Sequence, residues 1–367
     1  MKQFSDILKS RAGKLKSQNP SSTEGTVYWQ SPSNIAIVKY WGKFPGQIPA
    51  NASLSLTLSK SLTKTRIEYN YDPNRSQTEL DFKFDGKENQ TFSKRLNTYL
   101  ENIHLYLPWL AHTNLSIASE NTFPHSSGIA SSASSMSALA LGLCEIDKEI
   151  YHTETEINGH RMASFLARLG SGSASRSVYE KMSIWGETSS WKASSDEYAV
   201  PFDKIHGDFE IIHDSILIIE SGQKEVSSST GHAMMHSNPY ASKRFESAEQ
   251  NMQRLIPALS KGDWMEFIEI MENEALSLHA MMLTSNPGFI LMKPKTLIAI
   301  NKVREFRRET GINIGFTLDA GANVHIIYCN KDLDAVRTFI EKDLRNICEN
   351  GIVIHDQMGS GPKSITL

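Results

Sequence analysis

The chain has 367 residues, of which 40% are hydrophobic, and it is therefore long enough for two domains with sizeable cores. Its 38 basic and 41 acidic residues give a formal net charge of −3, and neither sign forms a long run. This balance argues against nucleic acid and against a membrane surface as partners, and it favours a small-molecule ligand.

Residues 1–26 are predicted to be an N-terminal extension, either frayed or helical. They carry charges throughout and contain no apolar run long enough for a signal-peptide core. No other stretch approaches the ~20 consecutive apolar residues that a membrane helix needs. Cys144, Cys329 and Cys348 are too scattered for a disulfide framework or a metal site, so a cytoplasmic protein is expected.

Strands and helices alternate in the first half of the chain. Residues 27–40 and 51–71 have the apolar and β-branched pattern of strands. Helical spacing of apolar residues predicts helices over 92–107 and 160–169, and a helix rich in alanine and leucine over 133–143. The polar stretch 191–200 is a candidate linker, so the predicted domains are residues 27–195 and 196–367.

The second half is predicted to begin with a strand over 209–220. Helical patterns follow over 241–282 and 294–309, and the second ends just before Thr310 and Gly311, where the glycine is a helix stop signal. Residues 313–329 predict a strand, a glycine-containing loop and a second strand. A helix over 333–348 and a short strand complete the chain, and no internal repeat is present.

A candidate phosphate loop, NTFPHSSGIASSA (121–133), leads directly into the helix rich in alanine and leucine. Gly128 permits close approach of the backbone, and Ser131 and Ser132 supply hydroxyl groups. The unpaired N–H groups of a helix start attract an anion. Taken alone, the segment is equally compatible with an ordinary loop that caps a helix.

A second small-residue loop, SGSASR (171–176), places an arginine after three serines. The planar guanidinium group of Arg176 suits a carboxylate or a phosphate. An ion pair at the surface or between domains is the alternative interpretation, and for a single arginine it is the commoner one.

Three further polar residues occur beside apolar strands. NIAIVKYWGK (34–43) places Lys39 and Lys43 in or next to an apolar run, where a lysine needs an anionic partner or a route to solvent. Asp319 lies between an apolar strand and the loop AGAN, where it can face a cleft or cap a turn. His232 and His236 have the one-turn spacing of a zinc helix, but no third ligand is apparent, so no resident metal site is predicted there.

Together these segments resemble the GHMP kinase superfamily and, within it, the mevalonate diphosphate decarboxylases. The phosphate loop alone indicates only the superfamily, whereas KYWGK, SGSASR and TLDAGAN in this order are specific to the decarboxylases. The resemblance runs from about residue 27 to the C-terminus. The matching segments are NIAIVKYWGK (34–43), NASLSLTL (51–58), FPHSSGIASSAS (123–134), GSGSASRS (170–177) and FTLDAGANVH (316–325).

The resemblance implies a two-domain α+β fold with the active site in the cleft between the domains. It implies an ATP-dependent decarboxylase that converts 5-diphosphomevalonate to isopentenyl diphosphate in the mevalonate pathway of isoprenoid biosynthesis. In such enzymes ATP phosphorylates the tertiary hydroxyl of the substrate, and loss of that phosphate accompanies loss of CO₂. Relatives are commonly homodimers.

The resemblance also assigns the site residues. Asp319 is expected beside the tertiary hydroxyl, Lys39 beside Asp319 and the transferring phosphoryl group, and Arg176 at the substrate carboxylate. The substrate site is expected to comprise Asn34, Tyr40, Trp41, Gly42, Lys43, Arg95, Ser171, Gly172, Ser173, Ala174, Ser175, Arg176, Ser229 and Thr230. The ATP site is expected to comprise Pro124, Ser127, Gly128, Ile129, Ala130, Ser131 and Ser132. Mg²⁺ is expected on the ATP phosphates, with Ser131 or Ser132 as the candidate protein ligand.

The loop KEVSSSTGHAMM (224–235) departs from the family, because bacterial relatives often carry an arginine near a Gly-Met pair. Ser229 and Thr230 bring no charge, so preference for a diphosphate over a monophosphate substrate stays open. A GHMP-type kinase of mevalonate or phosphomevalonate that stops after phosphorylation is the second hypothesis. A non-catalytic metabolite-binding protein is the third, and the presence of both the phosphate loop and Asp319 argues against it.

Overall fold

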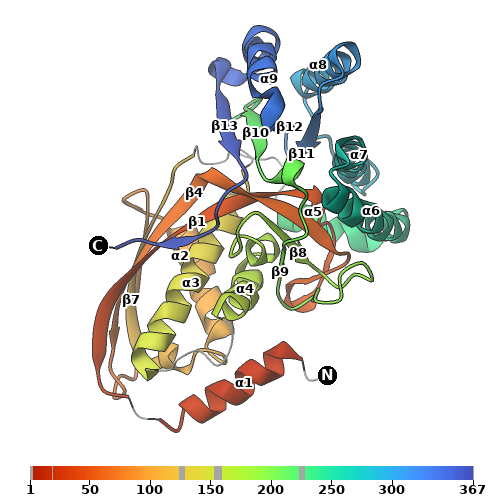
Figure 1. Ribbon diagram of the computed structural model, residues 1–367. Coiled ribbons are helices and arrows are strands. Elements are labelled where there is room, and N and C mark those ends of the chain that lie inside the picture. Colours follow the sequence, from red (N-terminus) through yellow and green to blue (C-terminus); the bar gives the residue numbers. More distant parts are fainter. Residues whose placement is uncertain (1–2, 19, 124–128, 153–158, 223–227, 367) are drawn as a thin grey trace.

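The computed structural model describes residues 3–18, 20–123, 129–152, 159–222 and 228–366. Two layered units make up the fold (Figure 1), each consisting of a mostly antiparallel sheet with helices packed on it. The prediction of a two-domain α+β fold is confirmed.

The first unit is built on a sheet of eight strands over the described residues, with the central order β14-β1-β4-β7-β5-β6. Its long antiparallel pair, β1 with β4, has Val27 opposite Ile67. The strands are β1 (Thr23–Val38), β4 (Ser53–Tyr71), β5 (Leu80–Phe84), β6 (Lys87–Glu88), β7 (Thr113–Asn121), β8 (Met182–Trp185), β9 (Val200–Phe202) and β14 (Lys363–Ser364). A small hairpin consists of β2 (Lys43–Phe44) and β3 (Ile48–Pro49).

Helices cover one face of this sheet, and they shield the apolar residues of its strands. They are α2 (Gln90–Ile103), α3 (Ser131–Tyr151) and α4 (Gly159–Gly170). Asn89 caps the start of helix α2, and its side chain accepts a hydrogen bond from the N–H of Phe92 at 3.1 Å. The sequence therefore located these helices, although α2 ends four residues earlier than expected and α3 continues eight residues beyond its expected end at residue 143.

The second unit has a four-stranded sheet between two helical layers. Apolar residues of α8 and α9 cover one face, and those of α6 and α7 cover the other together with β1 and β4. The strands are β10 (Ile212–Leu217), β11 (Ile314–Leu318), β12 (Val324–Cys329) and β13 (Val353–Gln357), in the order β11-β12-β10-β13. The helices are α5 (Ser228–Met234), α6 (Ala241–Lys261), α7 (Trp264–Leu283), α8 (Pro294–Thr310) and α9 (Leu333–Phe339).

Two expected helices differ in detail. The pattern over 241–282 is broken between α6 and α7, where Gly262 adopts a φ of 80° and Asp263 caps the next helix. The helix expected over 333–348 keeps regular α geometry only to Phe339, and a π-helical turn follows over Ile340–Leu344. The start of α8 at Pro294 and its end before Gly311 agree with the expected bounds to within one residue.

Strands and hydrogen bonds that pass from one unit to the other connect the two units. Strands β9 and β14 pair within the first sheet, although β14 follows the whole second unit in sequence. The buried carboxylate of Asp356 accepts hydrogen bonds of 2.8–2.9 Å from the N–H groups of Ser59, Lys60 and Ser61. The domain division at residues 195/196 stays a prediction, but these contacts join the two sheets firmly.

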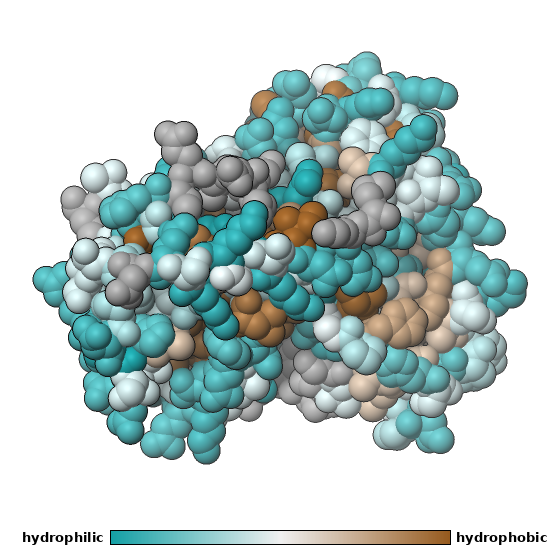
Figure 2. Space-filling view, turned by 90° about the horizontal axis from the view of Figure 1, so that it is seen from below, coloured by the Kyte–Doolittle hydropathy of each residue, from teal (hydrophilic) through white to brown (hydrophobic). Residues whose placement is uncertain are grey.

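The N-terminal extension contains α1 (Phe4–Leu15), which lies beside the helices of the first unit (Figure 1). Phe4, Leu8, Ala12 and Leu15 are buried at helical spacing, and Arg11 forms an ion pair with Asp147 on α3. Figure 2 views the molecule from this side and shows a mostly hydrophilic surface with hydrophobic residues in small groups. The helical alternative for the extension is therefore confirmed.

Truncation of Leu8 is expected to loosen α1. Because Leu8 is only 1% exposed, Leu8→Ala is expected to lower the free energy of unfolding by about 2–5 kcal/mol. If α1 instead detaches while the rest of the protein stays folded, the lost free energy cannot exceed the free energy with which α1 docks. Calorimetry and hydrogen exchange of α1 check this, with Lys9→Ala on the exposed face of the helix as the control. Equal melting temperatures and equal exchange for the two variants would contradict it.

Candidate active site

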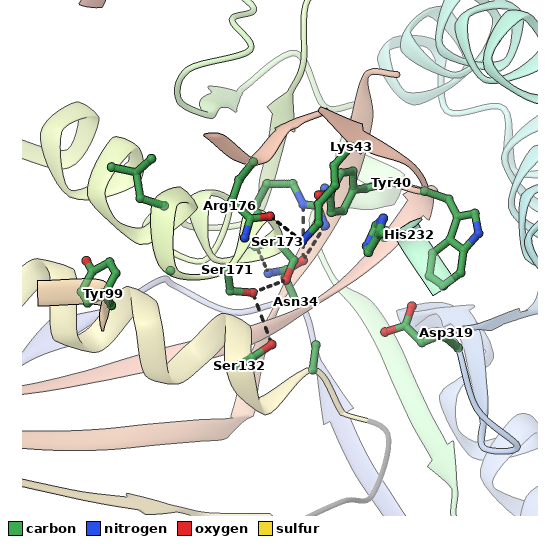
Figure 3. A pocket seen from close by; sticks show the side chains of 18 of the residues that line it. Asn34, Tyr40, Lys43, Tyr99, Ser132, Ser171, Ser173, Arg176, His232 and Asp319 are labelled. Carbon is green, nitrogen blue, oxygen red and sulfur yellow. Dashed lines mark hydrogen bonds between the residues drawn. The ribbon is translucent and has the colours of Figure 1, made fainter. Parts of the chain in front are cut away.

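A cavity of about 630 Å³ lies between the two units. Figure 3 shows labelled side chains that come together from β1, α2, α3 and the loop after α4, and from α5 and the loop after β11. The predicted residues that line it are Asn34, Lys39, Tyr40, Trp41, Lys43, Arg95, Ala130, Ser132, Ser171, Gly172, Ser173, Arg176 and Asp319. The expected cleft between the domains is thus present.

A lysine–aspartate pair bridges the two units at this cavity. Lys39 directly follows β1 and is 2% exposed, and its Nζ lies 3.1 Å from Oδ1 of Asp319. Burial lowers the pKa of Lys39, and the Asp319 carboxylate opposes that shift. Asp319 follows β11, and its side chain is 28% exposed, so the carboxylate is accessible from the cavity.

Arg176 is held by neutral oxygen atoms. Its Nε and a terminal nitrogen lie 3.4 and 3.3 Å from Oδ1 of Asn34, and its other terminal nitrogen donates to Ser53. Burial lowers the pKa of Arg176 to about 10, so it keeps its charge at neutral pH. A buried cation with neutral hydrogen-bond acceptors suits an anion bound in the cavity.

A row of hydroxyl groups joins the start of α3 to the Arg176 loop. Ser132 Oγ lies 3.3 Å from Ser171 Oγ, which lies 3.4 Å from Ser173 Oγ. The side-chain amide of Asn34 donates to the carbonyl of Ser173 at 3.1 Å and orders this loop. The two small-residue loops, far apart in sequence, therefore form one polar wall.

Tyr40 and His232 form an aromatic wall on the other side. Their ring centroids are 4.3 Å apart, and the buried hydroxyl of Tyr40 makes no hydrogen bond within the described part of the chain. Burial lowers the pKa of His232 to about 3, so its ring is neutral. Its Nδ1 accepts from the N–H of Gly42 at 2.9 Å, which places the ring proton on Nε2.

Positive charge gathers around the same cavity. Lys43 Nζ donates to Gln47 at 2.8 Å, and burial lowers the pKa of Lys43. Lys94 and Arg95 on α2 line the cavity and are exposed. Several cations around one cavity suit a ligand that carries several negative charges.

Two family models match this chain. The Diphosphomevalonate decarboxylase-like N-terminal domain matches residues 31–199, and the Mevalonate 5-diphosphate decarboxylase C-terminal domain matches residues 215–360. The chain belongs to the diphosphomevalonate decarboxylase family. Its activity is thus ATP-dependent decarboxylation in the mevalonate pathway, and the predicted family and enzyme class are confirmed.

Individual relatives agree with this assignment. A diphosphomevalonate decarboxylase of Aspergillus fumigatus is 30% identical over 340 residues, covering 86% of this chain and 80% of that one. The mevalonate diphosphate decarboxylase structure from Staphylococcus aureus has a TM-score of 0.80 at 26% identity and covers 94% of this chain and 99% of its own. A structure of MDDEF in complex with MVAPP, AMPPCP and magnesium has a TM-score of 0.78 at 27% identity, with coverage of 94% and 100%. ATP and Mg²⁺ as cosubstrate and metal are thereby confirmed.

Several predicted residues of the decarboxylase site do not line the cavity or lie outside the described residues. Gly42, Ala174 and Ser175 do not line it; Ala174 and Ser175 are buried and shape the turn. Pro124, Ser127, Gly128 and the side chain of Ser229 lie outside the described residues. Thr230 is exposed on α5 and does not line the cavity, so its role stays a prediction.

The predicted ATP residues lead to a second, more apolar cavity of about 160 Å³. Ser131 and Ser132 line it at the start of α3, whereas the predicted ATP residue Ile129 is buried in the apolar core and lines neither cavity, so its role stays a prediction. Phe82, Phe84 and Phe92 are among its walls. Because this cavity shares Arg95, Tyr99, Ser132 and Gly170 with the larger one, the two adjoin.

Among the described residues, the donor set fits Mg²⁺ as an ion carried by phosphates. The described residues contain no cluster of three or more His, Cys, Asp or Glu side chains suited to a metal. Ser131 and Ser132 offer the hard oxygen donors that Mg²⁺ accepts beside phosphate oxygens. None of the helices in the described residues has the length and hydropathy of a membrane span.

Sequence reasoning missed the cavity roles of His232, Tyr99 and Gln47. The sequence suggests His232 only as a metal ligand. In the fold its neighbour Gly231 packs against Trp41, where a Cβ would lie 2.5 Å from the ring, and nothing in the local sequence shows that contact. Two further missed residues, Glu274 and His279, lie on α7 behind the cavity. Nothing in the local sequence distinguishes them from ordinary helix residues.

Proposed function

We propose that Asp319, Lys39 and Arg176 divide the decarboxylation chemistry among them. The observation that carries this proposal is the pairing of Asp319 with buried Lys39 in a cavity that Arg176 also lines. In this assignment Asp319 accepts the proton of the tertiary hydroxyl of diphosphomevalonate as the hydroxyl oxygen attacks the terminal phosphorus of ATP. The Lys39 ammonium keeps the carboxylate ionised and offsets the charge on the transferring phosphoryl group.

Arg176 binds the substrate carboxylate in this proposal, with Asn34, Ser171 and Ser173 beside it. As the new phosphate leaves with the electrons of its C–O bond, the electron pair of the bond to the carboxylate forms the C=C bond and CO₂ departs. Holding the carboxylate where its C–C bond aligns with the leaving group is a positioning contribution. The row of hydroxyl groups from Ser132 to Ser173 supports this orientation, because it runs from the start of α3, assigned to ATP, to the loop assigned to the substrate carboxylate.

The diphosphate of the substrate is assigned to the cationic and aromatic end of the cavity. Tyr40, Lys43 and Arg95 line it there, with Lys94 as an additional cation. Several cations favour a diphosphate over a monophosphate, since each added negative charge gains another partner. Competition between diphosphomevalonate and phosphomevalonate tests this preference.

ATP is assigned to the start of α3 and the adjoining apolar cavity. Phosphates at a helix start interact with its free N–H groups, and the apolar cavity with its three phenylalanines suits a planar base. Mg²⁺ bound to the phosphates supplies charge neutralisation, with Ser131 or Ser132 as its candidate protein ligand.

A cytoplasmic location and a homodimer complete the proposal. Cys144, Cys329 and Cys348 are free thiols, as expected in a reducing compartment. The homodimer rests on the resemblance to the family alone, and light scattering of the purified protein tests it.

The product assay comes first. With ATP, Mg²⁺ and carboxyl-labelled diphosphomevalonate, labelled CO₂ is expected in step with ADP. ADP without CO₂ would instead identify a kinase that stops after phosphorylation. If neither product appears, with the monophosphate substrate as well, only the fold resemblance remains.

A further inference from the structure

Helix α7 carries two buried polar side chains that face the lysine–aspartate pair from behind. Glu274 reaches the backbone of Lys39, and His279 reaches the backbone of Asp319. Both residues therefore act on the pair without lining the cavity. A single helix thus contacts both Lys39 and Asp319, the two residues that meet across the domain junction.

Glu274 is fully buried and has a complete set of partners. Its Oε2 accepts from the N–H of Lys39 at 2.8 Å and from Arg244 at 2.5 Å. Its Oε1 accepts from Arg244 at 3.1 Å and from Asn251 at 2.6 Å. Such a bidentate pair fixes the carboxylate in orientation as well as in position.

The carbonyl of Lys39 is held as well. Asn51 Nδ2 donates to it at 2.9 Å, and Arg244 lies 3.5 Å from it. Because β1 ends at Val38, the backbone of Lys39 lacks the pairing of a strand interior. Side chains from other elements therefore supply the hydrogen bonds that fix this residue.

His279 holds the other member of the pair. It is 1% exposed, and burial lowers its pKa to about 4, so the ring is neutral. Its Nε2 lies 3.1 Å from the carbonyl oxygen of Asp319, so Nε2–H donates this bond. The N–H of Gly321 donates to the same oxygen at 2.7 Å.

We propose that Glu274 and His279 are positioning residues, and that α7 acts as the template that sets the separation of Lys39 and Asp319 across the domain junction. This inference rests on the proposed roles of Lys39 and Asp319. A displacement of about 1 Å between a base and its reacting group costs on the order of 10²-fold in rate, so such a template affects kcat directly.

Glu274 also has an electrostatic effect on Lys39. The charged groups that face the Lys39 ammonium are Asp319 and Glu274, which raise its pKa, and Arg176, which lowers it. Arg244 contacts the Lys39 carbonyl, and His279 is neutral. Removing the charge of Glu274 is therefore expected to lower the pKa of Lys39.

The test compares Glu274→Gln with Glu272→Gln in the full-length enzyme. Glu272 is a matched control because it is buried on the same helix and pairs with Arg304 and Arg307, at 3.2 and 2.6 Å. Both variants are expected to lower the melting temperature. Only Glu274→Gln is expected to lower kcat, by about tenfold with KM changed less than about twofold, and to move the high-pH decline of kcat to lower pH.

His279 provides a second test that leaves the Glu274 ion pair intact. His279→Leu is expected to lower kcat several-fold, and His279→Gln, which keeps an N–H donor, to recover part of that loss. Equal kcat losses and unchanged pH profiles in Glu274→Gln and Glu272→Gln, or equal kcat in the two His279 variants, overturn the proposal. If Glu274→Gln does not fold, the comparison of kcat between His279→Leu and His279→Gln tests the proposal. Wild-type enzyme that releases no CO₂ is a different outcome, and it refutes the proposed function instead.

Discussion

Asp319→Asn is expected to release almost no CO₂, with kcat lower by about 10²- to 10⁴-fold. An asparagine amide fits the same space but cannot accept the hydroxyl proton. It also leaves the 2%-exposed Lys39 without its ion-pair partner, so the pKa of Lys39 falls further. Single-turnover measurement of ADP and CO₂ checks the result, because both products depend on the phosphorylation step.

The controls for this prediction are the ATP affinity of Asp319→Asn and the activity of a second carboxylate variant. Asp319→Asn is expected to bind ATP with unchanged affinity, because Asp319 does not line the apolar cavity at the start of α3. Asp208→Asn, at an exposed carboxylate paired with His206, is expected to keep full activity. If Asp319→Asn retains more than about a tenth of the wild-type kcat, a carboxylate base at this position is ruled out.

Arg176→Lys is expected to lower kcat/KM by about 10²-fold or more. The ammonium group is a point charge that cannot bond to Asn34, Ser53 and a substrate carboxylate in one plane. Because phosphorylation does not require an aligned carboxylate, ADP formation is expected to fall less than CO₂ release. Parallel measurement of the two products gives the ratio.

Arg168→Lys is the matched control for this substitution. Arg168 is also buried, stacks on Phe165 and donates to the backbone carbonyls of Glu197 and Gly46, but it does not line the cavity. Arg168→Lys is expected to be less stable than the wild type but to keep the ratio of CO₂ to ADP near the wild-type value. Equal effects of the two substitutions on that ratio would argue against carboxylate binding by Arg176.

The sequence was sufficient to identify the candidate catalytic residues because each lies within a short contiguous motif. SGSASR and TLDAGAN each combine a small-residue turn with one charged residue, and the structure brings Arg176 and Asp319 to the same cavity. The single-residue alternatives, a surface ion pair for Arg176 and a simple turn cap for Asp319, do not account for that shared lining. Local signals also set α8, whose Pro294 start and Gly311 end follow from backbone preference alone.

Long-range contacts decided what the sequence left open. The N–H of Lys39 meets Glu274 across 235 residues of chain, and on its helix that glutamate has no local mark to separate it from Glu272. His232 acquires its role only when α5 packs it against the rings of Tyr40 and Trp41. The extension, open between frayed and helical, is ordered because α1 buries four side chains on the first unit.

The sequence by itself determined the alternation of strands and helices, the two small-residue loops and the family. These depend on local backbone preference and on short motifs, which are properties of neighbouring residues. Only the tertiary structure decided that β14 returns to the first sheet and that α7 supports the pair of Lys39 and Asp319. Those outcomes depend on which distant polar groups find partners when water is excluded, and no local pattern encodes that choice.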